Sequence, residues 1–408
     1  GLMKNLSKLT FYTILIRVIN LSLRLSLIVI LGKFYSLEFV GIYGLILALV
    51  GICVQMIPFE FYSYTTLEIL EKNEMSTNKV LANHFFFIFL MGCICSPIFY
   101  ATYGYFSLDY SLFFYISFVL VFEILARELS RVLVALEHPI ATYIIASIHS
   151  SLWIFVIIIG LFQDKLFSIE EVLVLWGSSG IIAVTTGLYF VKQKVSDKIF
   201  HFNFLSIDWI KNGIFFTFPL LIGSLSHAMN QYVGRFFLGN NISLSDISVF
   251  TIYFQISALV LITVEVLQNI YIPTYVRNNS MKKSNNNYEY AMLIIIAFIA
   301  LIITFLQERI FIFINPELLN DLDTMHMLLL AMSALSFAAV LRNRLYVKRL
   351  KYKIMYSYFI AMIVSLIGNS VFVPRYGAYG SASTMFISGL FLCLSIYLFD
   401  KFNRPKIV

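Results

Sequence analysis

The sequence predicts an all-α polytopic membrane protein with about twelve transmembrane helices in two six-helix lobes. Hydrophobic residues make up 60% of the chain and charged residues 12%, with a mean hydropathy of +0.86. Soluble globular chains are roughly half apolar and one quarter charged. About twelve apolar segments have the roughly 20 residues that a helix needs to cross a bilayer. The net charge of +7 is spread over the connections between these segments, so it does not indicate nucleic-acid binding.

The predicted helices fall into two sets of six along the chain. The first set is expected near Leu9–Leu31, Gly41–Leu67, Leu81–Ala101, Tyr110–Leu136, Ile140–Phe162 and Val172–Val191. The second set is expected near Ile214–Leu238, Val249–Val276, Ala291–Ile314, Leu322–Leu345, Ile354–Val373 and Ala378–Phe399. We therefore expect an N-terminal lobe over 1–195, a cytoplasmic or interfacial linker over 196–212 and a C-terminal lobe over 213–408.

The distribution of positive charge predicts the orientation of these helices. With both termini inside, the cytoplasmic segments hold eighteen Lys and Arg residues. The outer segments hold only Lys33, Lys165, Arg309 and Arg375. Cytoplasmic loops of membrane proteins carry the excess of Lys and Arg, so both termini are predicted to be cytoplasmic.

The two sets of helices show signs of an internal repeat. Among other matches, a shift of about 207 residues aligns Gly32 with Gly239, Ser36 with Ser243 and Tyr43 with Phe250. Six helices in each half is an even number, so both halves keep the same orientation. Parallel repeats of this kind predict a central site between the halves.

Seven of the 29 positive residues fall in or at the ends of the apolar segments, and all seven are Arg. They are Arg17, Arg24, Arg127, Arg131, Arg235, Arg342 and Arg344. An ionisable group at bilayer depth is costly and usually faces a protein-lined cavity. Arg provides a planar, permanently charged donor that suits phosphate and carboxylate. This pattern favours an interior that handles anions.

The first predicted helix carries one polar face. Arg17, Asn20 and Arg24 are spaced so that they share a side of the helix. Arg24 lies near the middle of the span, where it cannot easily reach the interface. We interpret this face as lining the cavity, and the alternative is a structural ion pair with a neighbouring helix.

The seventh predicted helix carries a comparable polar stripe. Ser224, His227, Gln231 and Arg235 lie within about 80° of arc on an ideal helix. Such a stripe is not expected to face lipid. We interpret it as a second cavity face, with hydrogen-bonded packing between helices as the alternative.

Charged residues in three other helices are further candidates. Glu60 and Glu265 are expected to be buried carboxylates that could exchange a proton or a sodium ion, or serve as counter-ions for a neighbouring Arg. In the fourth helix, Glu123, Arg127 and Arg131 recur at four-residue intervals, with Glu128 three residues before Arg131. We count Arg127 as a cavity candidate, and the alternative is a salt-bridged helix end.

No catalytic residue, cofactor or metal site is predicted. The four cysteines, Cys53, Cys93, Cys95 and Cys393, all fall in apolar spans and form no metal or disulfide pattern. We find no nucleotide-binding motif and no Ser/His/Asp set, and the connections are too short for a catalytic domain. The chain is therefore expected not to be an enzyme.

Four short segments resemble one family of membrane proteins. Ser36–Tyr43 resembles the outer connection into the second helix of polysaccharide flippases, and Phe218–Leu221 and Gly234–Gly239 look like parts of their seventh helix. Val373–Ala382 resembles the turn before their last helix. The chain is thus similar to the Wzx-type flippases of the multidrug/oligosaccharidyl-lipid/polysaccharide exporter (MOP) superfamily.

The resemblance implies a MATE-like, V-shaped bundle in a bacterial inner membrane. It implies a flippase that moves an undecaprenyl-diphosphate-linked oligosaccharide, an O-antigen or capsule repeat unit, from the cytoplasmic to the periplasmic leaflet. Alternating access coupled to proton or sodium antiport is expected. Other expected partners are membrane lipid and, within lipopolysaccharide or capsule synthesis, a polysaccharide polymerase and a chain-length regulator.

The resemblance also implies cavity arginines in the first, second, fourth, seventh and eighth helices. This sequence has them in the first, fourth and seventh, whereas the second and eighth carry Glu60 and Glu265.

Two alternative functions remain open. A drug or cation antiporter of the same fold should have an excess of buried acids. In this sequence the predicted spans and their ends hold seven Arg residues and only five acidic residues. A membrane glycosyltransferase or polymerase normally needs a long outer loop with carboxylates.

Overall fold

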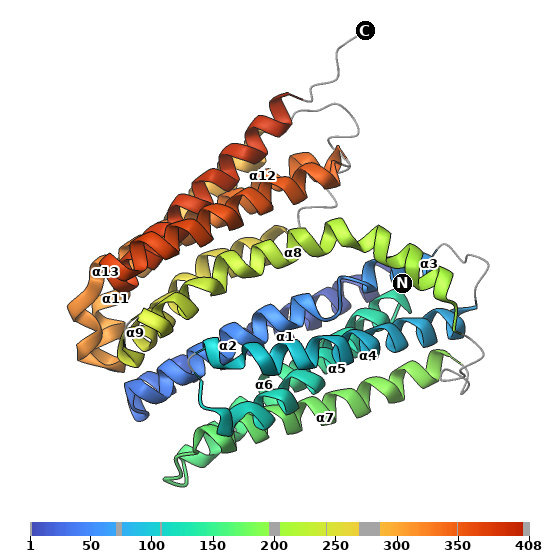
Figure 1. The fold of residues 1–408 in the computed structure, drawn as a ribbon, viewed down its shortest axis with the longest axis horizontal. Coiled ribbons are helices and arrows are strands. Elements are labelled where there is room, and N and C mark those ends of the chain that lie inside the picture. The colour runs from blue at the N-terminus through green and yellow to red at the C-terminus, as the bar shows by residue number, and fades with distance from the viewer. Residues whose placement is uncertain are drawn as a thin grey trace. The chain divides into compact units, whose positions relative to one another are not determined.

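The computed structural model is all-helical, as the composition predicts (Figure 1). It describes residues 2–70, 76–106, 108–195, 205–241, 243–268, 286–348 and 350–402. Eight helices in this part of the chain are long and apolar enough to cross a membrane. The predicted fold class, an all-α polytopic membrane protein, is confirmed.

The helices agree closely with the predicted spans. The first half contains α1 (Leu2–Phe34), α2 (Leu37–Met56), α3 (Tyr62–Leu70), α4 (Thr77–Thr102), α5 (Phe113–Ala135), α6 (Pro139–Leu161) and α7 (Ile169–Lys194). The second half contains α8 (Ile207–Asn241), α9 (Leu244–Ser257), a helical stretch over 259–268, α11 (Asn286–Ile314), α12 (Leu322–Val347) and α13 (Lys351–Lys401). Short 3-10 helices cover Tyr103–Phe106, Tyr110–Leu112 and Pro316–Asp321.

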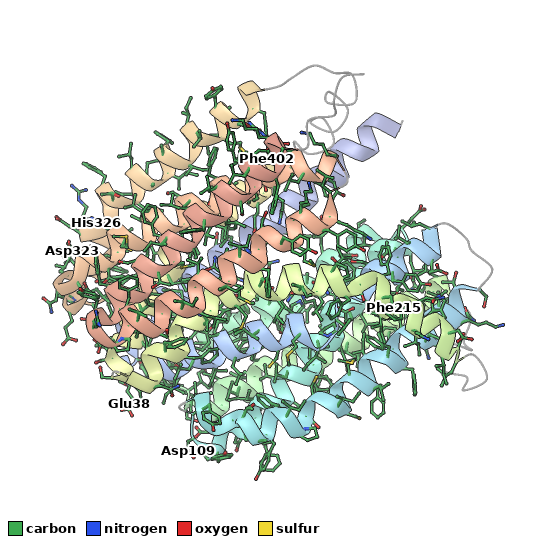
Figure 2. All side chains as sticks on the ribbon, turned by 45° about the horizontal axis from the view of Figure 1, so that its top comes forward. Glu38, Asp109, Phe215, Asp323, His326 and Phe402 are labelled. Atoms are coloured by element: carbon green, nitrogen blue, oxygen red, sulfur yellow. The ribbon has the colours of Figure 1, made fainter. Side chains whose placement is uncertain are left out.

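Charged side chains mark several helix ends. Asp109 lies in the connection before α5, where its carboxylate accepts a hydrogen bond from the backbone N–H of Ser111, and Asp323 lies in the first turn of α12 (Figure 2). At the start of α7, Ser168 and Glu171 form a capping box. These side chains satisfy or complement the free backbone N–H groups that every helix start leaves.

Contacts divide the chain into two compact units. The first unit comprises 1–29 and 49–221, and the second comprises 30–48 and 222–408. The predicted lobes over 1–195 and 213–408 remain a prediction. Residues 207–212, expected in the linker, form the start of α8, and the linker stretch 196–204 lies outside the described residues.

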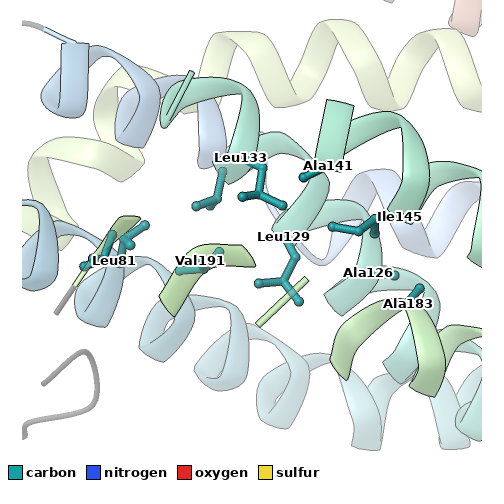
Figure 3. Packing of buried hydrophobic residues seen from close by; sticks show 10 residues of the cluster. Leu81, Ala126, Leu129, Leu133, Ala141, Ile145, Ala183 and Val191 are labelled. Atoms are coloured by element: carbon teal, nitrogen blue, oxygen red, sulfur yellow. The ribbon is translucent and has the colours of Figure 1, made fainter. Parts of the chain in front are cut away.

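The core of the first unit lies where α5, α6 and α7 pack together. Leu129 of α5, Ile145 of α6 and Ala183 of α7 meet there, joined by Leu81 of α4 (Figure 3). All four side chains are fully buried or nearly so. Burial of this kind fixes the rotation of each helix about its axis, and therefore decides which polar side chains meet inside the unit.

In the second unit, α12 makes its most extensive contact with α13 and also contacts α9 and α11. The helix α13 contains the last two predicted spans, which meet at a kink at Gly377. Gly377 has φ 56° and ψ −133°, a conformation that only glycine adopts without strain. The sequence Val373–Pro374 before it removes a helical N–H, so the kink has a local cause.

The first half of α2 packs closely against α9. An added Cβ at Gly41 would strike the carbonyl oxygen of Leu244, and one at Gly44 would strike the hydroxyl of Thr251. Gly41 and Gly44 of α2 therefore allow close packing of the two helices.

Candidate functional site

The second predicted span is interrupted at 57–61, between α2 and α3. Pro58 disfavours a helical conformation for the residue before it. Phe59 and Glu60 then adopt left-handed backbone angles, with φ of 59° and 56°. Such angles cost roughly 1–2 kcal/mol for each non-glycine residue, so the surrounding structure must hold the break in place.

An aromatic cluster holds this break. Phe61 is fully buried and stacks on Phe87 of α4 with 4.1 Å between ring centroids. Phe61 also meets Trp209 of α8 in an edge-on arrangement, with 5.5 Å between ring centroids. Phe59 also contacts Phe87. Burial of these rings offsets the backbone strain, so the turn presents Glu60 in a defined position.

Glu60 is buried and linked to α5 through one amide. With the amide of Gln55 oriented to satisfy both neighbours, its nitrogen donates to Glu60 Oε1 and its oxygen accepts from Arg127 NH2, each at 3.2 Å. Two sequence candidates, Glu60 and Arg127, therefore meet through a residue that the sequence analysis did not single out. We call Glu60, Gln55 and Arg127 the broken-helix site.

A second polar cluster joins α5 to α3 and α4. Arg131 donates to Glu128 Oε1 at 2.7 Å, and His84 Nε2 lies 3.3 Å from Glu128 Oε2. The other ring nitrogen of His84 is 2.8 Å from the hydroxyl of Thr65. The guanidinium of Arg131 also covers the ring of Tyr62 at 4.0 Å. The side chains of His84 and Glu128 are fully buried, so this cluster is an internal ion-pair network.

Glu123 is held by a separate set of partners. Its carboxylate lies 3.3 Å from His149 Nδ1 and accepts a hydrogen bond from Trp176 Nε1 at 3.0 Å. The Trp176 ring stacks on Trp153 at 5.3 Å. Glu123 thus joins α5, α6 and α7. Although Glu123, Arg127 and Arg131 follow one another at four-residue intervals along α5, each of them contacts a different set of side chains.

On α1 the predicted polar face has two different roles. Asn20 donates to Ser147 and accepts from Ser151, each at 2.9 Å, so it ties α1 to α6. Arg24 is exposed, and no described side chain forms an ion pair or a hydrogen bond with it. Arg17 lies in α1, but its side chain is outside the described residues.

In the second unit, His227 and Gln231 of α8 lie 3.0 Å apart through their side-chain nitrogens. His227 meets the ring of Tyr358 edge-on, and Arg342 of α12 donates to the Tyr358 hydroxyl at 3.2 Å. Glu265, expected to be buried, is exposed, and it forms no direct ion pair with a described side chain.

Arg235 differs from every other described arginine. Its side chain has no exposed surface, and none of its three guanidinium nitrogens has a hydrogen-bond partner among the described residues. The guanidinium lies over the ring of Phe254 at 4.4 Å and near the ring of Tyr232 at 5.5 Å. A buried charge normally needs an ionic partner. This guanidinium is therefore available for an anionic group that reaches it.

Sequence reasoning missed several members of these clusters. Gln55, Tyr62, Thr65 and Trp176 are ordinary residues of apolar helices, and His84 had no visible partner. Their partners lie on other helices, so no spacing along the chain could reveal them. The local pair of Glu128 and Arg131 was detectable because it lies within one helical turn.

Known protein-family profiles and curated proteins give no match to this sequence. Solved structures do match its fold. An inward-facing multidrug resistance MATE family transporter of the MOP superfamily has a TM-score of 0.76 at 11% identity, over 93% of each chain. The lipid II flippase MurJ, in an inward closed conformation, also has a TM-score of 0.76, at 13% identity, over 96% of this chain and 87% of that one.

This chain shares the fold of these two solved structures. A mutant of the Vibrio cholerae MATE transporter VcmN also matches, with a TM-score of 0.52 at 12% identity, over 98% of this chain and 97% of that one. At such low identity the likeness concerns the backbone path alone. The choice between substrates therefore depends on the side chains of this chain.

Proposed function

We propose that this protein is a flippase for an undecaprenyl-diphosphate-linked oligosaccharide, moving it from the cytoplasmic to the periplasmic leaflet. The MOP-superfamily fold supports a transporter that works by alternating access. One of the matched structures is named as a flippase for a lipid-linked substrate, lipid II. The substrate class is inferred from the charge of the interior.

The arginines of the helices carry this proposal. Arg131 and Arg344 are in ion pairs with carboxylates, while Arg342 donates to a tyrosine hydroxyl. Among the described side chains, Arg24 of α1 and Arg235 of α8 have neither kind of partner. Each belongs to the first helix of one half of the chain. Two uncompensated guanidinium groups favour a diphosphate or another anionic head group.

The carboxylates argue against a cationic substrate. Three acids already have basic or hydrogen-bond-donating partners: Glu123 contacts His149 and Trp176, Glu128 contacts Arg131 and His84, and Glu289 contacts Arg344. Glu60 is bridged to Arg127 through Gln55. An organic cation without an anionic group of its own would displace these partners and leave them uncompensated, so these acids are poor sites for such a cation.

For coupling, we propose that Glu60 exchanges a proton or a sodium ion. Its position at a helix break resembles the discontinuous helices where transporters bind ions. Neutralising Glu60 would weaken its hold on Gln55, and Gln55 also binds Arg127. Ion exchange at Glu60 is thereby connected to α5 through a single amide.

The first experiment is to delete the gene in its own host and to measure surface polysaccharide and lipid-linked intermediates together. Loss of polymer with complete repeat units accumulating on the cytoplasmic face would support the flippase. Complete units that reach the outer face but stay unpolymerised would overturn it in favour of the polymerase alternative. A cell that keeps its polysaccharide but becomes sensitive to cationic dyes would favour the drug antiporter.

Complementation then tests the substrate-binding role of the two arginines. Arg24→Ala and Arg24→Lys, and the same changes at Arg235, should fail to restore polysaccharide at wild-type protein level. Matched controls are Arg309→Ala and Arg375→Ala, which remove arginines from predicted outer connections. Full complementation by both Arg24 variants would contradict the proposal that Arg24 binds the anionic head group of the substrate.

A further inference from the structure

A groove of about 460 Å³ opens on the second unit beside α12. Its lining comes from α11, α12 and α13. The helix α12 contacts both of its neighbours, whereas α11 and α13 are not among the packed pairs of helices in the described residues. The groove therefore has α12 as its floor, with Phe337 and Leu341, and the other two helices as its walls.

The groove is charged at one end and apolar along its length. At the charged end, Arg344 of α12 forms a bidentate ion pair with Glu289 of α11 and also lies 3.5 Å from Asp400 of α13. Lys348 donates to Asp400 at 2.6 Å. Two basic and two acidic groups thus alternate across three helix ends. We call these four residues the ion quartet.

Below the ion quartet the lining is apolar. Leu293 of α11 and Leu390 and Leu394 of α13 line the walls, and each has more than a third of its surface exposed. Leu390 lies ten residues before Asp400, which corresponds to about 15 Å of helix. That length is about half of a hydrocarbon core roughly 30 Å thick, or one leaflet.

The surroundings of the groove belong to the membrane. Only 22% of the apolar window of α11 is buried inside the protein, so most of this helix faces outward. The ion quartet lies at the helix ends that the positive-charge bias assigns to the cytoplasmic interface. Tyr290 and Tyr397 line the same end, and tyrosine is enriched at the level of lipid head groups.

We propose that this groove binds one phospholipid of the cytoplasmic leaflet, with a zwitterionic, amine-bearing head group at the ion quartet and an acyl chain along Leu390 and Leu394. The quartet carries no net charge. Arg344 and Glu289 line the groove, so a zwitterionic head group could exchange with their ion pair, its phosphate meeting Arg344 and its ammonium group meeting Glu289. A purely anionic head group would meet Glu289 and Asp400 unfavourably. This inference does not depend on the transported substrate.

The proposal is tested by native mass spectrometry of the full chain taken from vesicles of phosphatidylethanolamine and phosphatidylglycerol. One phosphatidylethanolamine should stay bound through delipidation. Leu394→Trp should reduce its occupancy at least tenfold, because the larger side chain fills the groove. The matched control is Leu301→Trp on the exposed face of α11, outside the groove, which should keep the lipid.

A second measurement uses a thiol that the groove already contains. Cys393 lines the groove, and its thiol donates to the carbonyl of Ala334 at 3.3 Å. In a Cys53→Ser, Cys93→Ser, Cys95→Ser background, phosphatidylethanolamine should slow maleimide labelling of Cys393 at least fivefold, and phosphatidylglycerol should not. Equal protection by both lipids, equal lipid loss in both Trp variants, or retention of a polyprenyl lipid instead would overturn the proposal.

Discussion

The guanidinium carbon of Arg235 lies 4.4 Å from the centroid of the Phe254 ring, inside the second unit and away from solvent. A cation over an aromatic face gains about 0.5–2 kcal/mol, which is less than the cost of burying an unpaired charge. The residue therefore contributes little to folding by itself. Its value is expected to lie in binding.

We predict that Arg235→Leu separates stability from function. Thermal unfolding in detergent should be unchanged within about 1 kcal/mol or should shift upward, because an apolar side chain replaces an uncompensated charge. Surface polysaccharide should nevertheless be lost in the complementation assay. A large drop in melting temperature would instead show that Arg235 stabilises the folded protein.

Glu60 allows backbone strain and side-chain chemistry to be separated. Its φ of 56° favours glycine, so Glu60→Gly should be more stable than Glu60→Ala by about 1 kcal/mol. Both variants lack the carboxylate that contacts Gln55, so both should lose transport to the same extent. Parallel melting curves and complementation assays test this. Recovery of transport in the glycine variant alone would mean that transport requires the backbone conformation of the turn and not the carboxylate of Glu60.

The cluster around Glu128 should behave as one unit. Removing Glu128 leaves Arg131 and His84 without their common partner, so Glu128→Ala should destabilise the protein by about 3–5 kcal/mol. The double variant Glu128→Leu with Arg131→Met should be less destabilised than the sum of its single changes. The four melting temperatures of this cycle measure the coupling. Strict additivity would argue against a shared network.

Close packing between α2 and α9 gives a prediction with an internal control. Gly44→Ala should destabilise the protein by about 1–3 kcal/mol, since its Cβ would strike Thr251. Thr251→Ala in the same chain should recover part of the loss, because it removes the atom struck first. Gly92→Ala is the matched control, because a Cβ there meets nothing within 4 Å. Equal effects at Gly44 and Gly92 would contradict the packing account.

Much of the fold follows from the sequence because lipid restricts what a chain can do. Backbone groups in a bilayer must find hydrogen bonds inside their own helix, so a long apolar run leaves little choice of structure. The span predicted over Ile140–Phe162, for example, is observed as Pro139–Leu161. The broken second span is an exception, and its signal was Pro58 followed by Glu60 in an otherwise apolar run.

The candidate site was only half visible in the sequence. A charge at bilayer depth is conspicuous, so Arg24, Glu60 and Arg235 could be singled out from composition alone. Their partners could not, because Gln55 and Phe254 are unremarkable along the chain. Asn20 illustrates the opposite outcome, since its polar side chain is used in packing against α6.

The sequence by itself determined that this protein is a bundle of membrane helices with several arginines in its predicted spans, because hydropathy and charge act locally on each segment. The tertiary structure decided which charges are already satisfied. Glu128 has two basic neighbours, while the guanidinium of Arg235 lies against aromatic rings and has no hydrogen-bond partner among the described residues. That distinction depends on how each helix is rotated against the next, and the rotation is set by packing of side chains that lie far apart in the chain.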